Sequence, residues 1–348
     1  MAESKFDFLV FIGRFQPFHR GHEAVLRAAL QQAAHVIVLV GSAHRPRCSR
    51  NPWSFDERHA MVSSLLDHDE RRRTHVMPLM DATYNDPLWL RTVQQCVSGV
   101  VAAHHSQPHR AARIGLIGHS KDRSSYYLTR FPQWSSVDVP NVGGLNATDI
   151  RQRLFEAPSG TISDDVVPGP VAAQLASFLD TSEFADLRDE TVFIRNYRAQ
   201  WANAPYTPMF VTVDAVVVQS GHVLLVERKA RPGRGQWALP GGFVDGDEDL
   251  QTAALRELKE ETRIKVPLPV LAGSISRRDV FDDPHRSARG RTFTHAFLIE
   301  LKPDKTLPKV RGGDDARHAF WVPLAELAPE RCFEDHYFIV QRLVGGPR

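Results

Sequence analysis

The stretch from Gly13 to His22 combines residue types that suit a bound polyphosphate. It reads Gly-Arg-Phe-Gln-Pro-Phe-His-Arg-Gly-His, follows the apolar run Phe8–Ile12 and precedes the helix-like run Glu23–Leu30. It should therefore be the turn between a strand and a helix. Its glycines allow a close backbone approach, and the amides at a helix start favour an anion.

The charged side chains of this stretch favour the same ligand. Arg14 and Arg20 bring fixed positive charge, while His19 and His22 bring hydrogen-bond donors. By themselves, two histidines at a helix start favour a phosphate site no more than a plain helix cap or a solvated edge. With the glycines and Arg14 in register, we favour a phosphate site formed by Gly13, Arg14, His19 and His22.

A second group of chemically capable residues consists of Glu257, Glu260 and Glu261. Their i, i+3 and i+4 spacing places all three carboxylates on one helical face, where like charges repel. Such a cluster suits Mg²⁺ or Mn²⁺. By itself it is more simply a solvated acidic face, so the metal-site interpretation depends on the residues around it.

An arginine-rich loop follows this helix in the sequence. Arg286, Arg289 and Arg291 lie within the polar segment 279–291. They could contact a diphosphate or a terminal phosphate. A solvated loop is an equal alternative at this point.

The elements that must position the first group alternate between strands and helices. Such alternation predicts a parallel sheet whose ligands sit beyond the carboxyl ends of the strands. After Phe8–Ile12, the expected strands are Val36–Val40, His75–Leu79, Ile114–Ile117 and Val137–Val139.

Helix-start signals accompany these strands. Ser54 begins a capping-box pattern that predicts a helix through Leu66, and Asp86-Pro87 reads as an N-cap followed by proline at the first helical position. Thr148 resembles the N-cap of a later helix that carries Arg151 one turn in. Beside Gly13–His22, this second helix start would hold the other side of a triphosphate.

The second half begins with a hairpin and continues into one long helix. Strand-like runs cover Phe210–Val218 and His222–Glu227, and another covers Thr292–Leu301. This order predicts a mixed α+β sandwich. We expect a first domain at 1–182, a helical linker at 183–205 that packs on either domain, and a second domain at 206–348.

Composition sets the class of protein. The chain has 348 residues, a 42% hydrophobic content and a formal net charge of +2. This gives no reason to expect a nucleic-acid polymer or a membrane as partner. Cys48, Cys96 and Cys332 form no pairing or metal-ligand pattern, which suits a reducing compartment. With no signal peptide or membrane-spanning run, we expect a cytoplasmic protein; a homo-oligomer is compatible with the sequence.

The motif Gly13–His22 resembles the His-x-Gly-His nucleotidyltransferase superfamily. Asn146-Ala-Thr-Asp-Ile-Arg151 is similar to its second signature, usually Ser-x-Thr-x-x-Arg, with Asn146 in place of the serine. Further segments at 41–43, 51–58, 81–89 and 120–128 look like archaeal-type nicotinamide mononucleotide (NMN) adenylyltransferases. The resemblance implies a Rossmann-like domain that makes NAD and pyrophosphate from ATP and NMN.

This resemblance also assigns side chains. It implies catalysis by Arg14, His19, His22 and Arg151, with Thr148 and Lys121 as further phosphate contacts. For Lys121, a solvated loop residue is an equal alternative. The resemblance places NMN against Asp81, Asn85 and Trp89, with Trp89 stacked on the nicotinamide ring. Without the resemblance, Trp89 would read as a core aromatic.

The register Gly242, Glu248, Arg256, Glu257, Glu260, Glu261 resembles the Nudix box. The resemblance implies an α/β/α-sandwich hydrolase with Gly242, Glu257, Glu260 and Glu261 at the metal, oriented by Glu248 and Arg256. Arg263 replaces a glycine of the pattern, so we expect a strained or rearranged helix end.

The two resemblances together predict a bifunctional enzyme of NAD metabolism. Its ligands would be ATP, NMN, NAD and ADP-ribose, with Mg²⁺ or Mn²⁺ in both domains. The second domain would hydrolyse ADP-ribose to AMP and ribose 5-phosphate. Two alternatives stay open: nicotinate mononucleotide as acceptor, and a Nudix half that hydrolyses another nucleoside diphosphate or only senses a nucleotide.

Overall fold

The apolar blocks of the first half form one parallel sheet. The computed structural model describes residues 5–105, 109–119, 129–140, 143–156, 163–313 and 316–345. The strands are β1 (Phe6–Gly13), β2 (Ala33–Val40), β3 (Thr74–Pro78), β4 (Ile114–Gly118) and β5 (Ser135–Asp138), in the order β3-β2-β1-β4-β5. The order reverses between β1 and β4, which is where such sheets bind ligands.

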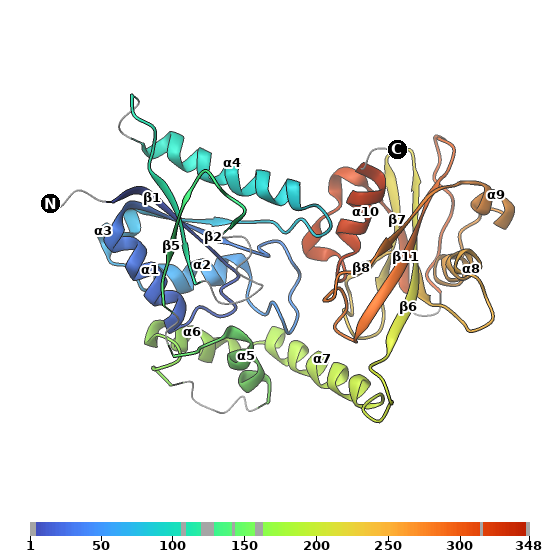
Figure 1. Ribbon diagram of the computed structural model, residues 1–348. Helices are drawn as coiled ribbons and strands as arrows, with labels where there is room; N and C mark the ends of the chain where they lie inside the picture. Colours follow the sequence, from blue (N-terminus) through green and yellow to red (C-terminus); the bar gives the residue numbers. More distant parts are fainter. Residues whose placement is uncertain are drawn as a thin grey trace. The chain divides into compact units, whose positions relative to one another are not determined.

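Helices cover both faces of this sheet (Figure 1). Successive β1 residues from Phe8 to Ile12 alternate between two cores. One core includes α1 (Arg20–Gln32) and α2 (Phe55–Ser63), and the other includes α4 (Asp86–His104). The unit is completed by α3 (His68–Arg72), α5 (Ala147–Glu156) and α6 (Gly169–Leu179).

The second half forms a mixed sheet between helices. Its main order is β10-β11-β6-β7-β12, with β6 parallel to β11 and the other pairs antiparallel. Figure 1 shows α8 and α10 on opposite faces of this sheet. The elements are β6 (Met209–Gln219), β7 (His222–Arg228), β8 (Trp237–Ala238), β9 (Gly241–Phe243), α8 (Leu250–Thr262), α9 (Leu268–Gly273), β10 (Ile275–Phe281), β11 (Arg291–Glu300), β12 (Ala316–Pro323), two 3-10 turns (Leu324–Glu326 and Pro329–Arg331) and α10 (His336–Gly345).

The two compact units are Met1–Arg188 and Asp189–Arg348. The division falls inside α7 (Ser182–Ala199), the helix of the predicted linker. Phe184 and Leu187 pack in the core of the first unit, while Glu190 accepts a hydrogen bond from the amide of Gly233 in the second. The helix therefore contributes to both units. The domain limits 1–182, 183–205 and 206–348 stay a prediction.

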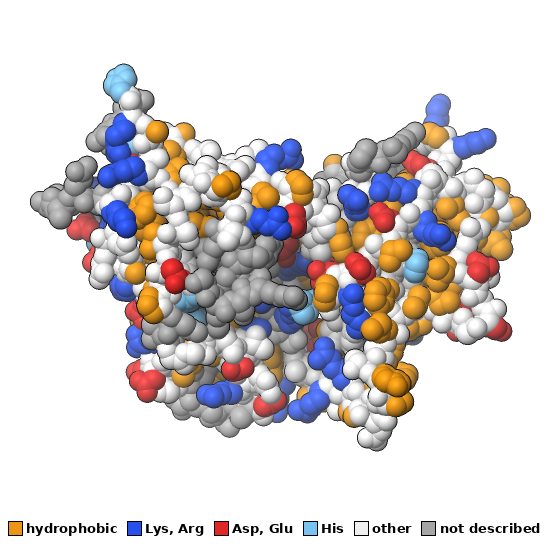
Figure 2. Space-filling view, in the orientation of Figure 1, with side chains coloured by type: hydrophobic (Ala, Val, Ile, Leu, Met, Phe, Trp, Pro, Cys, Tyr) orange, Lys and Arg blue, Asp and Glu red, His pale blue; other side chains and the backbone are white. Residues whose placement is uncertain are grey.

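The surface agrees with the small net charge. Figure 2 shows basic, acidic and apolar side chains interspersed on the visible face of each unit. Within the described residues, every helix is too short or too polar to cross a membrane.

Three predicted helix boundaries differ from the structure. The helix at Ser54 has the predicted capping box but ends at Ser63, not Leu66. The cap of α4 is Asn85, not Asp86, since the Asn85 side chain accepts from the amide of Leu88. Asparagine and aspartate cap equally well, and the first turn tolerates proline at more than one position, so the pattern could not separate them.

Thr148 is also not a cap. The helix α5 already begins at Ala147, and Asn146 Oδ1 accepts from the amide of Asp149 at 2.9 Å. Asn146 Nδ2 returns a hydrogen bond to the Asp149 carboxylate at 2.7 Å. Asn146, which replaces the serine of the motif, thus caps the helix itself and places Thr148 in its first turn.

Candidate active sites

His19 and His22 both bind backbone at the start of α1. His19 is the N-cap, and its Nδ1 accepts from the amide of Gly21 at 3.1 Å. His22 Nδ1 accepts from the amide of His19 at 3.3 Å, and the two rings stack at 3.7 Å. Because each Nδ1 is an acceptor, a neutral ring carries its proton on Nε2. The histidines therefore cap the helix through Nδ1, and their predicted role as donors to phosphate, which would use Nε2, stays a prediction.

A buried glutamine connects this turn to the segment after β2. The Gln16 side chain is 1% exposed and donates to Asn51 Oδ1 and to the carbonyl of Trp53. It also accepts from the amide of Trp53 at 3.0 Å. Its own carbonyl accepts from Arg151 Nη1 at 2.6 Å. The two predicted phosphate motifs thus meet at Gln16.

Arg151 lies in a positively charged environment. It is buried and donates to Thr148 Oγ1 at 3.1 Å as well as to Gln16. The pKa of Arg151 is lowered to about 10, mainly by burial and in addition by the nearby charges of Arg14 and Arg50. Clustered guanidinium groups that disfavour one another in this way favour an anion between them.

Arg58 holds the backbone on which these groups stand. Its side chain is fully buried and donates to the carbonyls of Arg14 and Gly41 at 2.7 Å and to that of Ser42 at 3.2 Å. Gly13 packs under the same turn, where a Cβ would lie 2.7 Å from the Phe15 ring. The ends of β1 and β2 are therefore fixed by one guanidinium.

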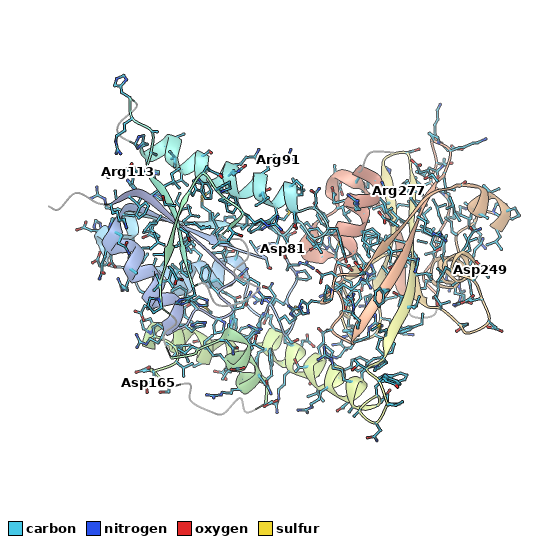
Figure 3. All side chains as sticks on the ribbon, in the orientation of Figure 1. Asp81, Arg91, Arg113, Asp165, Asp249 and Arg277 are labelled. Atoms are coloured by element: carbon cyan, nitrogen blue, oxygen red, sulfur yellow. The ribbon has the colours of Figure 1, made fainter. Side chains whose placement is uncertain are left out.

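The predicted NMN residues follow β3. Asp81, labelled in Figure 3, accepts from Ser42 Oγ at 2.9 Å and from Arg45 Nε at 2.9 Å. Asn85 caps α4 through its oxygen. Trp89 is half-buried and packs on the core beside Phe131, with ring centroids 6.2 Å apart. Lys121 lies outside the described residues.

In the second unit, Arg256 gathers the carboxylates of the predicted box. It binds both oxygens of Glu248, at 2.6 and 3.1 Å. Its Nη1 also donates to Glu257 Oε1 at 2.9 Å and to Glu260 Oε2 at 3.0 Å. Arg256, Glu257 and Glu260 stand on α8, which is capped by the side chain of Asp249, labelled in Figure 3. A Cβ at Gly242 would collide with the Glu257 carboxylate, so glycine is needed for this approach.

The buried carboxylates of this group have raised pKa values. The pKa of Glu261 is raised to about 8, because burial and the charge of Glu257 raise it by more than a hydrogen bond from the amide of Gly241, at 3.1 Å, lowers it. Burial also raises the pKa of Glu257. Carboxylates kept this close in a partly dry site fit a hard divalent cation, which would supply the missing positive charge.

The three loop arginines lie in different environments. Arg286 is buried and binds the Asp335 carboxylate with Nε at 3.0 Å and Nη2 at 2.9 Å. Arg289 lies over the ring of Phe243, at 5.3 Å from its centroid, next to the box. Arg291 lies over Phe293 at 4.4 Å. Of the three, Arg289 lies over the residue that directly follows Gly242 of the box.

Comparison with known proteins identifies the two units. Residues 10–92 match the model of the Cytidylyltransferase-like family, and residues 208–343 match that of the NUDIX domain. A nicotinamide/nicotinic acid mononucleotide adenylyltransferase of Acinetobacter baylyi is 37% identical over 56% of this chain and 96% of its own length. An ADP-ribose pyrophosphatase of Methanocaldococcus jannaschii is 34% identical over 38% of this chain and 70% of its own.

A solved structure spans both units. It is a bifunctional NMN adenylyltransferase/ADP ribose pyrophosphatase from Francisella tularensis, complexed with AMP and a manganese ion. It is 36% identical, covers 98% of this chain and 99% of its own, and superposes with a TM-score of 0.89. The chain belongs to this bifunctional family. The predicted fusion of a nucleotidyltransferase with a Nudix hydrolase is confirmed.

Several residues that shape the sites of this family member were not singled out from the sequence. Gln16 and Arg58 stand inside the quoted motifs, but their roles depend on contacts with distant segments. In the Nudix unit, Asp214 lies buried under the box, accepts from Thr294 Oγ1 at 2.6 Å and is 3.9 Å from Arg286. The sequence did contain one sign of this residue, since Asp214 is the single charged residue within the mostly apolar strand β6.

Proposed function

We propose that the first unit transfers an adenylyl group from ATP to NMN and releases pyrophosphate. The phosphate of NMN would attack the α-phosphorus of ATP, forming one P–O bond while the bond to the departing pyrophosphate breaks. Support comes from the names of the relatives and from the meeting of both phosphate motifs at Gln16. This last observation carries the proposal, because it brings Arg151 to the turn of His19 and His22.

The groups at the turn would stabilise negative charge. Arg14 and Arg151 supply positive charge, and the Nε2 protons of His19 and His22 supply hydrogen bonds to the triphosphate. Thr148 would add a hydroxyl contact, and Gly13 would allow the close backbone approach. Since a phosphate nucleophile needs no activation by a base, placement and charge neutralisation account for the catalysis. Lys121 remains a proposed further contact.

The acceptor would lie near the end of β3. We assign Trp89 to stacking on the nicotinamide ring, with Asn85 and Asp81 at its polar side. The half-buried position of Trp89 is compatible with a face that packs on the core and another that meets ligand. Asp81 would act mainly by orienting Ser42 and Arg45, to which it is already bound.

Nicotinate mononucleotide is a second candidate acceptor. The name of the A. baylyi relative covers both nicotinamide and nicotinic acid mononucleotides. Competition between the two acceptors, each supplied with ATP, decides between them. A higher kcat/KM with NMN supports the first assignment, and exclusive use of nicotinate mononucleotide overturns it.

The second unit would hydrolyse ADP-ribose to AMP and ribose 5-phosphate. Water adds to one phosphorus of the diphosphate, and the bridging P–O bond breaks. The network of Arg256 with Glu248, Glu257 and Glu260, beside buried Glu261, carries this proposal. Arg289 and Arg291 would contact the substrate, whereas Arg286 would act through Asp335.

Nudix hydrolases use a divalent metal, and the F. tularensis relative holds manganese. Here Glu257, Glu260, Glu261 and the backbone of Gly242 would hold Mg²⁺ or Mn²⁺. The ion would supply positive charge against the diphosphate and lower the pKa of water. Arg256 keeps the glutamates in place through one oxygen of Glu257 and of Glu260, so each retains a second oxygen for the ion. We propose Mg²⁺ with the triphosphate in the first unit as well.

Metal removal tests the second activity. We expect chelation by EDTA to abolish ADP-ribose hydrolysis and Mg²⁺ or Mn²⁺ to restore it. If metal-supplied protein binds ADP-ribose but releases no AMP, the unit is a nucleotide sensor and the hydrolase assignment fails.

A further inference from the structure

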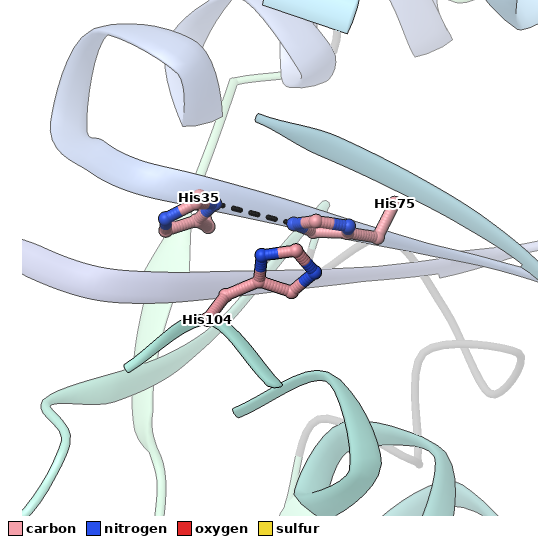
Figure 4. Close-up of side chains that lie close together, drawn as sticks. All are labelled: His35, His75 and His104. Atoms are coloured by element: carbon pink, nitrogen blue, oxygen red, sulfur yellow. Dashed lines mark hydrogen bonds between the residues drawn. The ribbon is translucent and has the colours of Figure 1, made fainter. Parts of the chain in front are cut away.

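Three histidines from distant parts of the sequence meet at the edge of the first sheet opposite to the phosphate motifs. His35 lies near the start of β2, His75 near the start of β3, and His104 is the last residue of α4. Because β2 and β3 are parallel, His35 and His75 both lie toward the amino ends of the strands. Gly13, in contrast, lies at the carboxyl end of β1, and Asp81 follows the carboxyl end of β3. Figure 4 shows the three rings turned toward one another.

Their spacing suits shared ligation. One nitrogen from each ring lies within 4.8 Å of the others. His35 Nδ1 and His75 Nε2 are 3.2 Å apart. Two nitrogens bound to one tetrahedral Zn²⁺ lie about 3.3 Å apart, given a Zn–N distance of about 2.0–2.1 Å. The strand pair already has this separation, and the exposed His104, whose nitrogen lies within 4.8 Å of the others, has to approach by at most about 1.5 Å.

The surroundings of His35 and His75 favour the neutral rings that bind metals. The pKa of His75 is lowered to about 4, mainly by burial and in addition by repulsion from His104 and His35. Burial also lowers the pKa of His35, where His104 and Arg73 contribute. Neutral imidazole is the metal ligand. The carboxyl end of the 19-residue helix α4, at which His104 stands, favours a cation, while the charge of Arg73 opposes it.

We propose that His35, His75 and His104 form a binding site for one divalent transition-metal ion, Zn²⁺ in the first place. Three imidazole nitrogens suit zinc, copper or nickel, whereas Mg²⁺ prefers oxygen. The neighbouring His105 is engaged elsewhere, with its Nε2 2.8 Å from the carbonyl of Arg110, so water would complete the coordination. Such an ion would tie the end of α4 to β2 and β3, away from both proposed active sites.

Metal uptake by the full chain tests this site. Chelator-treated protein is equilibrated with Zn²⁺ in the presence of excess Mg²⁺, and bound zinc is measured by elemental analysis. We expect His104→Ala to bind one Zn²⁺ fewer per chain than the wild type. His68→Ala is the matched control, because His68 is an exposed histidine of the same unit, 86% accessible, outside the cluster. Equal uptake by wild type and His104→Ala overturns the proposal.

Two further measurements test the site by other properties of the folded protein. Cu²⁺ bound to the wild type should give an electron paramagnetic resonance spectrum with nitrogen superhyperfine structure that the His104→Ala spectrum lacks or shows with fewer lines. Zn²⁺ should raise the Tm of wild type and His68→Ala more than that of His104→Ala. Both proposed activities should persist in His104→Ala. An oxygen-only copper spectrum in the wild type contradicts the site.

Discussion

Glu261 is a buried carboxylate whose ionisation is coupled to folding and, in the proposed metal site, to metal binding. Its pKa is raised to about 8, chiefly by burial. In the unfolded chain the same group ionises near its ordinary value of 4.5. The folded, metal-free protein therefore holds a proton that the unfolded chain has lost over this interval.

The sign of the stability effect follows from this. The contribution of Glu261 is fully present below pH 4.5 and is lost as the pH rises through about 8. We expect the Tm of EDTA-treated protein to fall over this range, and Glu261→Gln to have a flatter profile and a higher Tm near pH 8. Glu260→Gln is the control, since Glu260 is 43% exposed. If the Tm of the wild type and that of Glu261→Gln change with pH in parallel, the ionisation of Glu261 does not destabilise the folded protein and the account of this residue is wrong.

Arg151 provides a second test at single-residue scale. Its guanidinium reaches Gln16, Thr148 and, in the proposal, phosphate, which a lysine cannot do with one ammonium group. We expect Arg151→Lys to reduce kcat for adenylyl transfer by about 10²-fold, the scale of losing one preorganised donor. Hydrolysis of ADP-ribose should not change. Arg153→Lys, an exposed arginine on the same helix, is the control; equal losses in the two variants contradict the assignment.

Residue types and spacing were enough to nominate residues for both sites, whose roles stay predictions, but not to predict the partners of these residues. His19, His22 and Arg151 could be found because the motifs are local. Their connection through Gln16, and the burial of Arg286 against Asp335, depend on segments more than forty residues apart. Side-chain charge alone therefore left Arg286 indistinguishable from Arg289.

At the scale of elements, the end of α8 departs from the usual glycine. Arg263 has a left-handed backbone, with φ of 46° and ψ of 32°. Its amide donates to the carbonyl of Lys259 at 2.9 Å, as in an ordinary left-handed cap, and the amides of Arg311 and Gly313 donate in addition to the carbonyls of Thr262 and Glu261. Of the two outcomes expected at Arg263, strain or rearrangement, the structure shows a strained left-handed backbone with the usual cap hydrogen bond.

Relief of this strain is measurable. We expect Arg263→Gly to increase the free energy of unfolding by about 1 kcal/mol, since glycine adopts this backbone without a Cβ clash. Arg263→Ala keeps the Cβ and is the control, with little gain expected. Chemical denaturation of the three proteins measures the difference. A gain in Arg263→Ala equal to that in Arg263→Gly would assign the effect to the arginine side chain instead.

Helix starts were predictable to within a residue or two, and the errors have one cause. Adjacent capping residues compete, as Asn85 does with Asp86 and Asn146 with Thr148, and only the folded backbone decides which side chain reaches a free amide. The first of these errors matters for function, because Asn85 is both the cap of α4 and a proposed contact of the nicotinamide.

At the scale of the whole molecule, alternating strand and helix patterns predicted a parallel sheet followed by a mixed one. They did not predict the strand orders, because pairing joins segments that are far apart in the sequence and similar in composition. The linker helix α7 was equally undecided. The pattern of apolar residues along α7 does not indicate which unit each of them contacts. In the structure, Phe184 packs in the core of the first unit, whereas Glu190 accepts a hydrogen bond from a backbone amide of the second.

The central claim is that one chain carries two separate activities at two separate sites. Product analysis of the intact protein tests it, with ATP plus NMN in one reaction and ADP-ribose in another, both with Mg²⁺. We predict NAD and pyrophosphate from the first reaction, and AMP and ribose 5-phosphate from the second. His22→Ala should lose only NAD synthesis, and Glu261→Gln only hydrolysis. Loss of both activities in either folded variant, or no NAD from the wild type, would contradict this account.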